Sequence, residues 1–304
     1  MIISEETARR GLNPIFDLYL RTPESRETVT VMITRGSARR LLEQMMQIEK
    51  IPAAGIEGMI KMEAQNISML RNIKLYQLAM KLSSESAGSL LPEIELSGSG
   101  EVTSMQVFEK TTLPSKIKLG SSAVIKKDKM VGWMSRRESL GVSFITDNIN
   151  RTVLTVGCPD DSSSSSKSTV LIRKSSTSLV PSVQGNKLTI QVNIKAKGTL
   201  AQSECKAQDL YDPKVIKQLE KELEQEINAI AKAGWESAKK LKADVVGFAE
   251  LVHRKFPDKW HSWEQDWDTI LADIQVNVTS KVNLTNVGLS NQSIDVNHMK
   301  DVIK

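Results

Sequence analysis

Apolar and polar residues alternate most regularly in two segments of the last third of the chain. Every second residue is apolar from Leu188 to Ala196, and the same alternation runs from Ile274 to Leu284, interrupted at Ser280. A period of two predicts strands with one buried and one exposed face, which is typical of antiparallel sheets. We therefore predict a C-terminal antiparallel sheet that includes both segments.

Between these two segments, apolar residues recur every three to four positions, which predicts a long helix. Asp212 is a suitable N-cap, and Pro213 fits the first helical position. The apolar stripe consists of Ile216, Leu219, Leu223, Ile227, Ile230, Gly234, Ala238 and Leu241. Roughly thirty residues at about 1.5 Å each give a helix of about 45 Å that covers the sheet. At Gly234 a neighbouring element can approach closely or the helix can bend.

Two shorter helices are predicted next, over 244–256 and 258–270, separated by a proline. The second carries Trp260, Trp263 and Trp267 at spacings of three and four, so the three indoles share one stripe. We interpret this stripe as part of the core, with contact to a partner protein or a membrane interface as the alternative.

The first third of the chain has the order strand, helix, strand, helix. The predicted elements are a strand at Ile2-Ile3, two helical pieces in 5–21 behind an N-cap at Ser4, a strand over 29–34, a helix opened by Gly36-Ser37 and a helical stretch over about 54–82. This order is typical of part of an α/β layer.

The stretch 83–100 is rich in Ser, Gly and Pro, contains one short predicted strand, and is the best candidate for a domain boundary. Beyond it we predict strands over 102–110 and 123–127, a hairpin at Asp128-Lys129, a helix behind the Ser135 and Glu138 capping box, a strand over 151–157 and a flexible serine loop over 162–166. The predicted class is α+β and multi-domain, with an N-terminal α/β domain over 1–90 and an α+β domain over 91–304, in which 91–160 can form a subdomain.

The composition fits an ordinary globular protein, with 40% hydrophobic and 25% charged residues. Aromatic residues make up 4%, which argues against stacking of nucleic-acid bases. The 41 basic and 36 acidic residues predict a mixed surface; attraction to an anionic membrane would require a basic cluster that the sequence does not locate. No stretch approaches the about 20 apolar residues of a membrane span, and the first residues lack the features of a secretory signal.

The two cysteines are Cys158 and Cys205. Neither belongs to a Cys-x-x-Cys pair or lies near a histidine at metal-ligand spacing, and both fall in strand-like sequence. We predict buried free thiols, with one disulfide as the alternative in an oxidising compartment.

No segment has the spacing of a known catalytic or cofactor motif. A nucleophile elbow, a dinucleotide-binding glycine motif, a phosphate loop and a calcium loop are missing. The histidines, His253, His261 and His298, form no metal-binding pair and are predicted to be structural or surface residues.

Two charged runs have simple interpretations. Arg35 to Arg40 could hold an anion at a helix N-terminus, but an ordinary N-cap with solvated arginines is preferred. The glutamates from Glu220 to Glu226 are predicted to form a solvated helix face. We therefore predict no catalytic, metal-binding or cofactor-binding residues, and a protein that works through its surfaces rather than as an enzyme.

Five segments, in their order and spacing, resemble the Ger(x)C family over nearly the whole chain. They are Arg9-Arg10-Gly11-Leu12-Asn13-Pro14 with the stretch 21–26, then 123–133 ending in Gly132-Trp133, then Arg137-Glu138-Ser139-Leu140-Gly141, then 153–159 ending in Gly157-Cys158-Pro159, and finally 244–278 with Phe256-Pro257, Trp260 and Trp267. The resemblance implies a C-subunit lipoprotein of a spore germinant receptor. Such subunits are lipid-anchored at the outer face of the spore inner membrane, assemble with an A-subunit and a permease-like B-subunit, and are not known as enzymes.

The family pattern begins with a lipoprotein signal and a lipid-accepting cysteine, and this sequence contains neither. We therefore expect an incomplete first domain whose sheet has an unpaired edge, and lower stability in 1–82 than in 188–284. A periplasmic-type small-ligand binding module is the alternative function. An apolar pocket between domains with convergent polar groups would favour that alternative.

Overall fold

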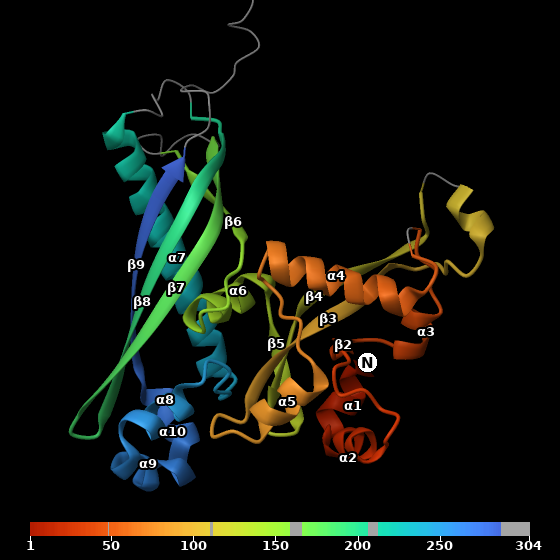
Figure 1. Cartoon of the computed structure of the whole chain (residues 1–304), viewed down its shortest axis with the longest axis horizontal. Coiled ribbons are helices and arrows are strands. Elements are labelled where there is room, and N and C mark those ends of the chain that lie inside the picture. The colour runs from red at the N-terminus through yellow and green to blue at the C-terminus, as the bar shows by residue number, and fades with distance from the viewer. Residues whose placement is uncertain (48, 110–111, 159–165, 206–211, 287–304) are drawn as a thin grey trace, which may run out of the picture.

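The computed structural model describes residues 1–47, 49–109, 112–158, 166–205 and 212–286, which form two sheets side by side (Figure 1). The first sheet has five strands in the order β1-β2-β3-β4-β5, and the second has four in the order β6-β7-β8-β9. Helices pack against both sheets, so the predicted α+β, multi-domain class is confirmed.

The first sheet is parallel at one edge and antiparallel at the other. Its strands are β1 (Ile2–Ser4), β2 (Met32–Thr34), β3 (Gly88–Gly98), β4 (Ser115–Lys126) and β5 (Lys129–Met134). The predicted hairpin at Asp128 joins β4 to β5. Because β3 contains residue 90, the sheet continues across the boundary predicted there; the division into 1–90 and 91–304 stays a prediction.

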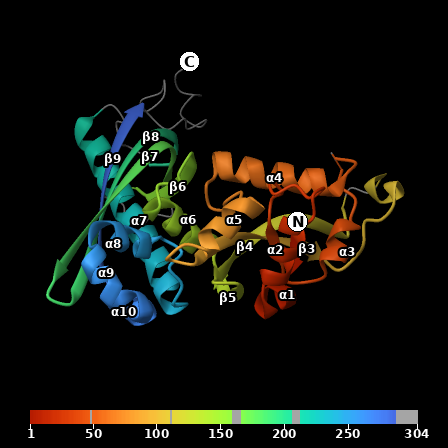
Figure 2. The same ribbon diagram turned by 60° about the horizontal axis from the view of Figure 1, so that its bottom comes forward.

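Helices cover both faces of the first sheet (Figures 1 and 2). They are α1 (Glu5–Arg10), α2 (Asn13–Arg21), α3 (Ala38–Leu42), α4 (Pro52–Asn66) and α5 (Leu75–Leu82). Alternation along the strands separates two core clusters. On one face of the sheet, Met32 and Ile94 pack with Ile60 of α4. On the other face, Ile33 and Leu91 belong to a cluster with residues of α1 and α5.

The helix predicted over 54–82 is wrong as one element, because the chain leaves the helix after Asn66 and re-enters one at Leu75. Ser68 adopts a left-handed conformation with φ 57°. Its hydroxyl accepts from the backbone N–H groups of Asn150 at 3.0 Å and Arg151 at 3.3 Å. A contact 82 residues away in the sequence therefore stabilises the break.

The strand predicted over 102–110 is also wrong, because the chain forms the 3₁₀ helix η1 (Met105–Glu109) there. Val102 is buried, and its backbone N–H donates to Gln44 Oε1 at 2.9 Å. Its carbonyl oxygen accepts from Met45 N at 2.7 Å. These bonds satisfy the backbone of Val102 without a neighbouring strand.

The second sheet consists of β6 (Thr152–Gly157), β7 (Lys167–Gln184), β8 (Lys187–Ser203) and β9 (Gln275–Asn286). The two segments with a period of two are confirmed as β8 and β9. The prediction of a purely antiparallel sheet is wrong, because β9 runs parallel to β8, with Ile190 opposite Val276. The helices between them return the chain to the same end of the sheet, as a parallel pair requires.

The long helix α7 (Pro213–Lys240) covers one face of this sheet, as predicted (Figure 1). Asp212 caps it by accepting from Lys214 N at 2.8 Å. At Gly234 the helix crosses α6 (Arg136–Ile145), and a Cβ there would lie 2.7 Å from the Glu138 carbonyl oxygen. The predicted close approach at Gly234 is thus confirmed.

Short helices complete the C-terminal part, at one end of the second sheet. They are α8 (Phe248–Lys255), α9 (Pro257–Trp263), η2 (Glu264–Asp266) and α10 (Trp267–Asp273). Trp260, Trp263 and Trp267 are all buried in the main core, which confirms the interpretation of the tryptophan stripe. No helix in the described part of the chain is long and apolar enough to cross a bilayer.

The prediction of free thiols is wrong, because Cys158 and Cys205 form a disulfide with a Cα–Cα distance of 5.5 Å. β6 and β8 both pair with β7, with Gly157 opposite Lys167 and Ser203 opposite Ser168. Both cysteines therefore leave the sheet beside the start of β7. The predicted loop over 162–166 lies outside the described residues, apart from Ser166.

Candidate functional site

The loop that precedes β3 joins the two sheets at one point. Ser86 Oγ donates to Asp244 Oδ2 at 3.0 Å and also bonds Glu250 Oε2. Asp244 is buried and accepts from three backbone N–H groups at the start of α8, among them Ala249 N at 2.7 Å. Burial raises the pKa of Asp244, and these N–H groups oppose the rise. The carboxylates at this joint are thus satisfied by hydrogen bonds.

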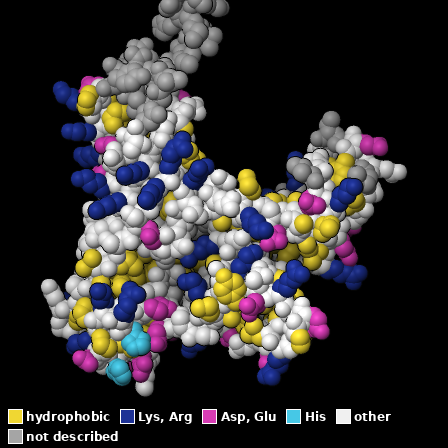
Figure 3. Space-filling view, in the orientation of Figure 1, with side chains coloured by type: hydrophobic (Ala, Val, Ile, Leu, Met, Phe, Trp, Pro, Cys, Tyr) yellow, Lys and Arg dark blue, Asp and Glu magenta, His cyan; other side chains and the backbone are white. Residues whose placement is uncertain are grey.

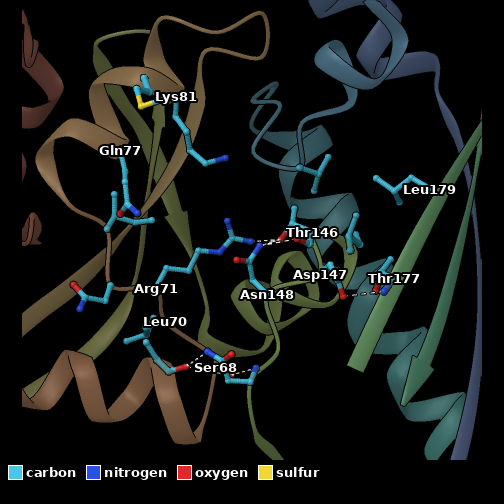
Figure 4. Close-up of a pocket in the computed structure, with 17 residues that line it drawn as sticks. Ser68, Leu70, Arg71, Gln77, Lys81, Thr146, Asp147, Asn148, Thr177 and Leu179 are labelled. Carbon is cyan, nitrogen blue, oxygen red and sulfur yellow. Dashed lines mark hydrogen bonds between the residues drawn. The ribbon is translucent and has the colours of Figure 1, made fainter. Parts of the chain in front are cut away.

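A second joint forms where Ser68 binds the backbone of Asn150 and Arg151. Asn150 Nδ2 also donates to the carbonyl oxygen of Ala64, the residue of α4 that lies one turn earlier, at 3.1 Å. Between the two joints lies a cleft of about 680 Å³ (Figure 4). The α4–α5 connection and α5 form one wall, and the end of α6, β7 and Val246 form the other.

The side chains that line this cleft are mixed in character. Apolar contributions come from Leu70, Ile73, Met80, Ile145, Leu179 and Val246. Polar contributions come from the amides of Asn72, Gln77 and Asn148, and from two cations, Arg71 and Lys81. Figure 4 shows Arg71 and Lys81 reaching into the same space from the wall that α5 belongs to.

Arg71 is held against the end of α6. Its Nη2 donates to Thr146 Oγ1, and the carbonyl oxygen of Val142 lies 3.5 Å away. Its Nε is fully covered and has no hydrogen-bond partner among the described residues. Burial lowers the pKa of Arg71 to about 10, because desolvation disfavours the charged form.

Lys81 is the second cation of the cleft. Burial lowers its pKa, the charge of Arg71 lowers it further, and Glu250 and Asp244 act in the opposite direction. Asp147 also lines the cleft, but its Oδ1 accepts from Thr177 N at 2.9 Å. Within the described ranges, neither Arg71 nor Lys81 has a carboxylate within the 4.0 Å of an ion pair.

The charged runs singled out in the sequence lie elsewhere. Ser37 accepts from Arg40 N at 3.2 Å, so the ordinary N-cap is confirmed. Arg35 pairs with Glu93 at 2.6 Å and lies over the ring of Trp133, which leaves no open anion cradle at its guanidinium.

The two described histidines lie outside the cleft, as structural or surface residues. His253 pairs with Glu85 at 3.0 Å and stacks on Trp260. His261 Nδ1 lies 2.8 Å from the carbonyl oxygen of Pro257 on an exposed turn. His298 falls outside the described residues, and no group of three potential metal ligands occurs in the described ranges.

The glutamates of α7 are not simply a solvated face, so that prediction is wrong in part. Glu224 Oε1 accepts from Val282 N at 3.0 Å, and Glu220 Oε1 accepts from Leu284 N at 2.8 Å. These N–H groups belong to the outer edge of β9, which has no further strand beside it among the described residues. The two carboxylates therefore satisfy a sheet edge.

Sequence reasoning missed the cleft. Arg71 and Lys81 fall within the helix predicted over 54–82, where cations are expected to reach solvent. Residues 67–75 mix apolar residues with Ser68, Arg71, Asn72 and Lys74, so no local pattern sets Arg71 apart.

Comparisons with known proteins give matches for both halves of the chain. Residues 1–96 match the family described as spore germination protein N-terminal domain, and 120–288 match the family described as spore germination B3/GerAC like, C-terminal. Spore germination protein KC of Bacillus subtilis (strain 168) is 24% identical over 303 residues, covering 97% of this chain and 72% of the relative. Spore germination protein GerQC of Bacillus cereus is 22% identical over 290 residues, covering 95% and 74%.

The fold is also that of a solved structure. The crystal structure of the GerBC protein superposes with a TM-score of 0.71 at 18% identity, covering 94% of this chain and 78% of that chain.

Proposed function

Because the chain belongs to the spore germination B3/GerAC-like family, and so has a role in spore germination, we propose that it is the C-subunit of a nutrient germinant receptor. In this proposal it assembles with the A- and B-subunits at the outer face of the spore inner membrane, and it catalyses no reaction. The observation that carries the proposal is the pair of family matches, which together span most of the chain in one order.

The open face of the second sheet, the side that α7 leaves uncovered, supports a place at an anionic membrane. Strands β6 to β9 contain no Asp or Glu. Their cationic residues, all exposed, are Lys167, Arg173, Lys174, Lys187, Lys195, Lys197 and Lys281. Figure 3 shows Lys and Arg side chains gathered over this sheet.

Four of these residues, Lys174, Lys195, Lys197 and Lys281, form what we name the lysine cluster. Lys174 lies opposite Lys197 on β8, and Lys195 lies opposite Lys281 on β9. Like charges in directly opposed positions destabilise a sheet. The four form no ion pair with any residue in the described ranges; Glu220 borders the same hollow, but its carboxylate is engaged by Leu284 N. This is the basic patch that attraction to anionic headgroups requires.

Assembly is tested by co-purification from detergent-solubilised spore membranes, with an affinity tag on this chain. The expected result is recovery of the A- and B-subunits together with the tagged chain. Recovery of the tagged chain alone, under conditions in which the A- and B-subunits still purify with each other, would contradict the proposal.

A further inference from the structure

The cleft between the sheets contains a charge imbalance that the protein itself does not resolve. Arg71 and Lys81 are both desolvated, and neither has a carboxylate partner in the described ranges. A buried charge is costly unless it is paired and hydrogen-bonded. The negative end of α6 faces Arg71, but a helix terminus supplies only about half an elementary charge. The one carboxylate among the described lining residues, Asp147, accepts from Thr177 N and pairs with neither cation, so the two cations of the lining outnumber its carboxylate.

Two atoms of the cleft are suited to bind an anion. Arg71 uses Nη2 for Thr146 and Val142, while its Nη1 donates to no described residue. The ammonium of Lys81 likewise makes no hydrogen bond within the described part of the chain. An anion at this position would accept charge-assisted hydrogen bonds from both side chains, and these are stronger than neutral ones.

The rest of the lining indicates what is attached to that anion. Leu179 and Val246 on one wall, and Met80 on the other, provide an apolar surface, and the amides of Gln77 and Asn148 can fix an orientation. Small-ligand sites have this composition, with volumes of roughly 300 to 1,000 Å³, a range that includes this cleft. Inorganic phosphate would use the two cations but leave the apolar surface of the cleft without a partner, whereas an organic carboxylate can contact both.

We propose that the cleft between the two sheets binds a small organic carboxylate, with its anionic end against Arg71 and Lys81 and its apolar part against Met80, Leu179 and Val246. This ligand site goes beyond the receptor-subunit function and does not depend on it. The site lies where both halves of the molecule contribute side chains, so the ligand would contact both.

The test is a titration of the full chain with acetate, 4-methylpentanoate and benzoate, each beside its neutral amide, and with inorganic phosphate. Isothermal titration calorimetry gives the affinity, and amide NMR shifts give the location. We expect saturable binding of at least one apolar carboxylate, with shifts confined to residues 68–81, 145–150, 177–179 and 246. Its amide should bind about tenfold more weakly or worse, because the charge-assisted hydrogen bonds are lost.

Substitutions of the two cations test whether the carboxylate binds in this cleft. Arg71→Met and Lys81→Met should each weaken carboxylate binding about tenfold or more. Arg39→Met is the matched control, because the Arg39 side chain is 88% exposed and pairs with Glu43, the residue after α3. The affinity of this variant for the carboxylate should equal that of the wild type. Circular dichroism and thermal unfolding verify that each variant folds.

Several outcomes would overturn the proposal. These are equal binding of an acid and its amide, undiminished binding by folded Arg71→Met, shifts outside the cleft, and saturable binding of phosphate but of no carboxylate. Absence of saturable binding by every probe would also overturn it. None of these outcomes bears on co-purification with receptor subunits, so the two proposals can fail separately.

Discussion

Arg71 and Lys81 show how a single side chain can be costly to the fold and still be useful. Both extend from one wall of the cleft, and neither forms an ion pair with a carboxylate of the described residues. Residues that reduce stability in the folded protein are often retained for binding, because a ligand relieves the same cost. Their titration offers a direct measure of this cost.

The pKa of Lys81 predicts a pH dependence of stability. The folded protein holds the proton on Lys81 less tightly than the unfolded chain, where lysine has its ordinary pKa of 10.5. The unfolded state therefore binds more protons between the two pKa values, and stability rises with pH through that window. The wild type should gain stability relative to Lys81→Met as pH increases from neutral to 10.5. Urea unfolding at the two pH values measures this; a difference that stays constant or moves the other way would contradict it.

Residues whose partners are close in sequence were the predictable ones. Ser4, Ser37, Ser135 and Asp212 each cap a helix through a backbone N–H within three residues, and the sequence pattern indicated all four. The partner of Ser68 lies 82 residues away. No local pattern reveals such a bond, so neither the break after α4 nor the cleft beside it could be derived from the sequence.

At the scale of elements, the crossing of α6 and α7 depends on the absence of side chains at Gly141 and Gly234. A Cβ on Gly234 would lie 2.7 Å from both the Glu138 carbonyl oxygen and Val142 N, and a Cβ on Gly141 would meet the Ile230 carbonyl oxygen. These are backbone atoms, which cannot rotate away as a side chain can. The helices would have to separate, and the core beneath them would lose packing.

Gly234→Ala should therefore destabilise the protein by about 1–3 kcal/mol, the usual cost of overpacking, although alanine is the better helix former. Gly58→Ala in α4 is the matched control, because a Cβ there has open space around it. It should stabilise by roughly 0.5–1 kcal/mol. Urea unfolding of both variants measures the difference, and equal effects of the two substitutions would refute the close crossing.

The second sheet shows both the strength and the limit of periodicity. Alternation gave the strands and their buried face, and a period of 3.6 gave α7, because burial against a partner imposes these periods directly. Alternation is the same for a parallel and an antiparallel neighbour, so it could not give the direction of β9. The roles of Glu220 and Glu224 could not be predicted for the same reason, because their partners are N–H groups of β9 and depend on where β9 lies in the sheet.

The lysine cluster on this sheet predicts binding to anionic membranes. Full-length chain should co-sediment with vesicles containing phosphatidylglycerol, and less so with purely zwitterionic vesicles. Replacing all four lysines by Gln should reduce the partition coefficient by about tenfold or more, since each basic residue near such a surface contributes about 1 kcal/mol.

The control variant carries Gln at Lys61, Lys118, Lys255 and Lys259, which are exposed lysines outside the cluster. It has the same net charge as the cluster variant, so a general charge effect would lower binding equally in both. Binding by the cluster variant that matches the control would refute a role for this face. Added salt should weaken the specific interaction, because exposed charges are screened over about 10 Å at 0.1 M.

At the scale of the whole molecule, the two sheets meet through apolar packing and through polar contacts. Leu90, Val124 and Met134 of the first sheet belong to the same core cluster as the second sheet. Lys126 pairs with Asp268 at 2.6 Å, His253 pairs with Glu85 at 3.0 Å, and Ser86 bonds Asp244 at 3.0 Å. The cleft lies beside these contacts, so a ligand in it would add contacts between the sheets. We infer that occupancy of the cleft and the relative stability of the two parts are thermodynamically linked.

Stability should differ between the two parts of the molecule. β1 and β2 have three residues each, and they contribute to the two smaller core clusters, not to the largest one. Residues of β7, β8 and α7 form much of the largest cluster, and the disulfide between Cys158 and Cys205 links the chain after β6 to the chain after β8. Local opening costs less where fewer apolar contacts are lost. Residues 1–82 should therefore exchange their amide hydrogens faster than 188–284 when the full chain is followed by hydrogen-exchange mass spectrometry.

The same experiment shows whether packing or the disulfide is the cause of the slower exchange in 188–284. Under reducing conditions exchange in 188–284 should rise only partly, because the sheet and α7 still bury its apolar face. Adding a saturating carboxylate should slow exchange in 67–82, where the break after α4 borders the cleft, more than in 1–34. Uniform protection along the chain would show instead that the contacts between the sheets couple both parts into one cooperative unit, and would contradict the predicted difference.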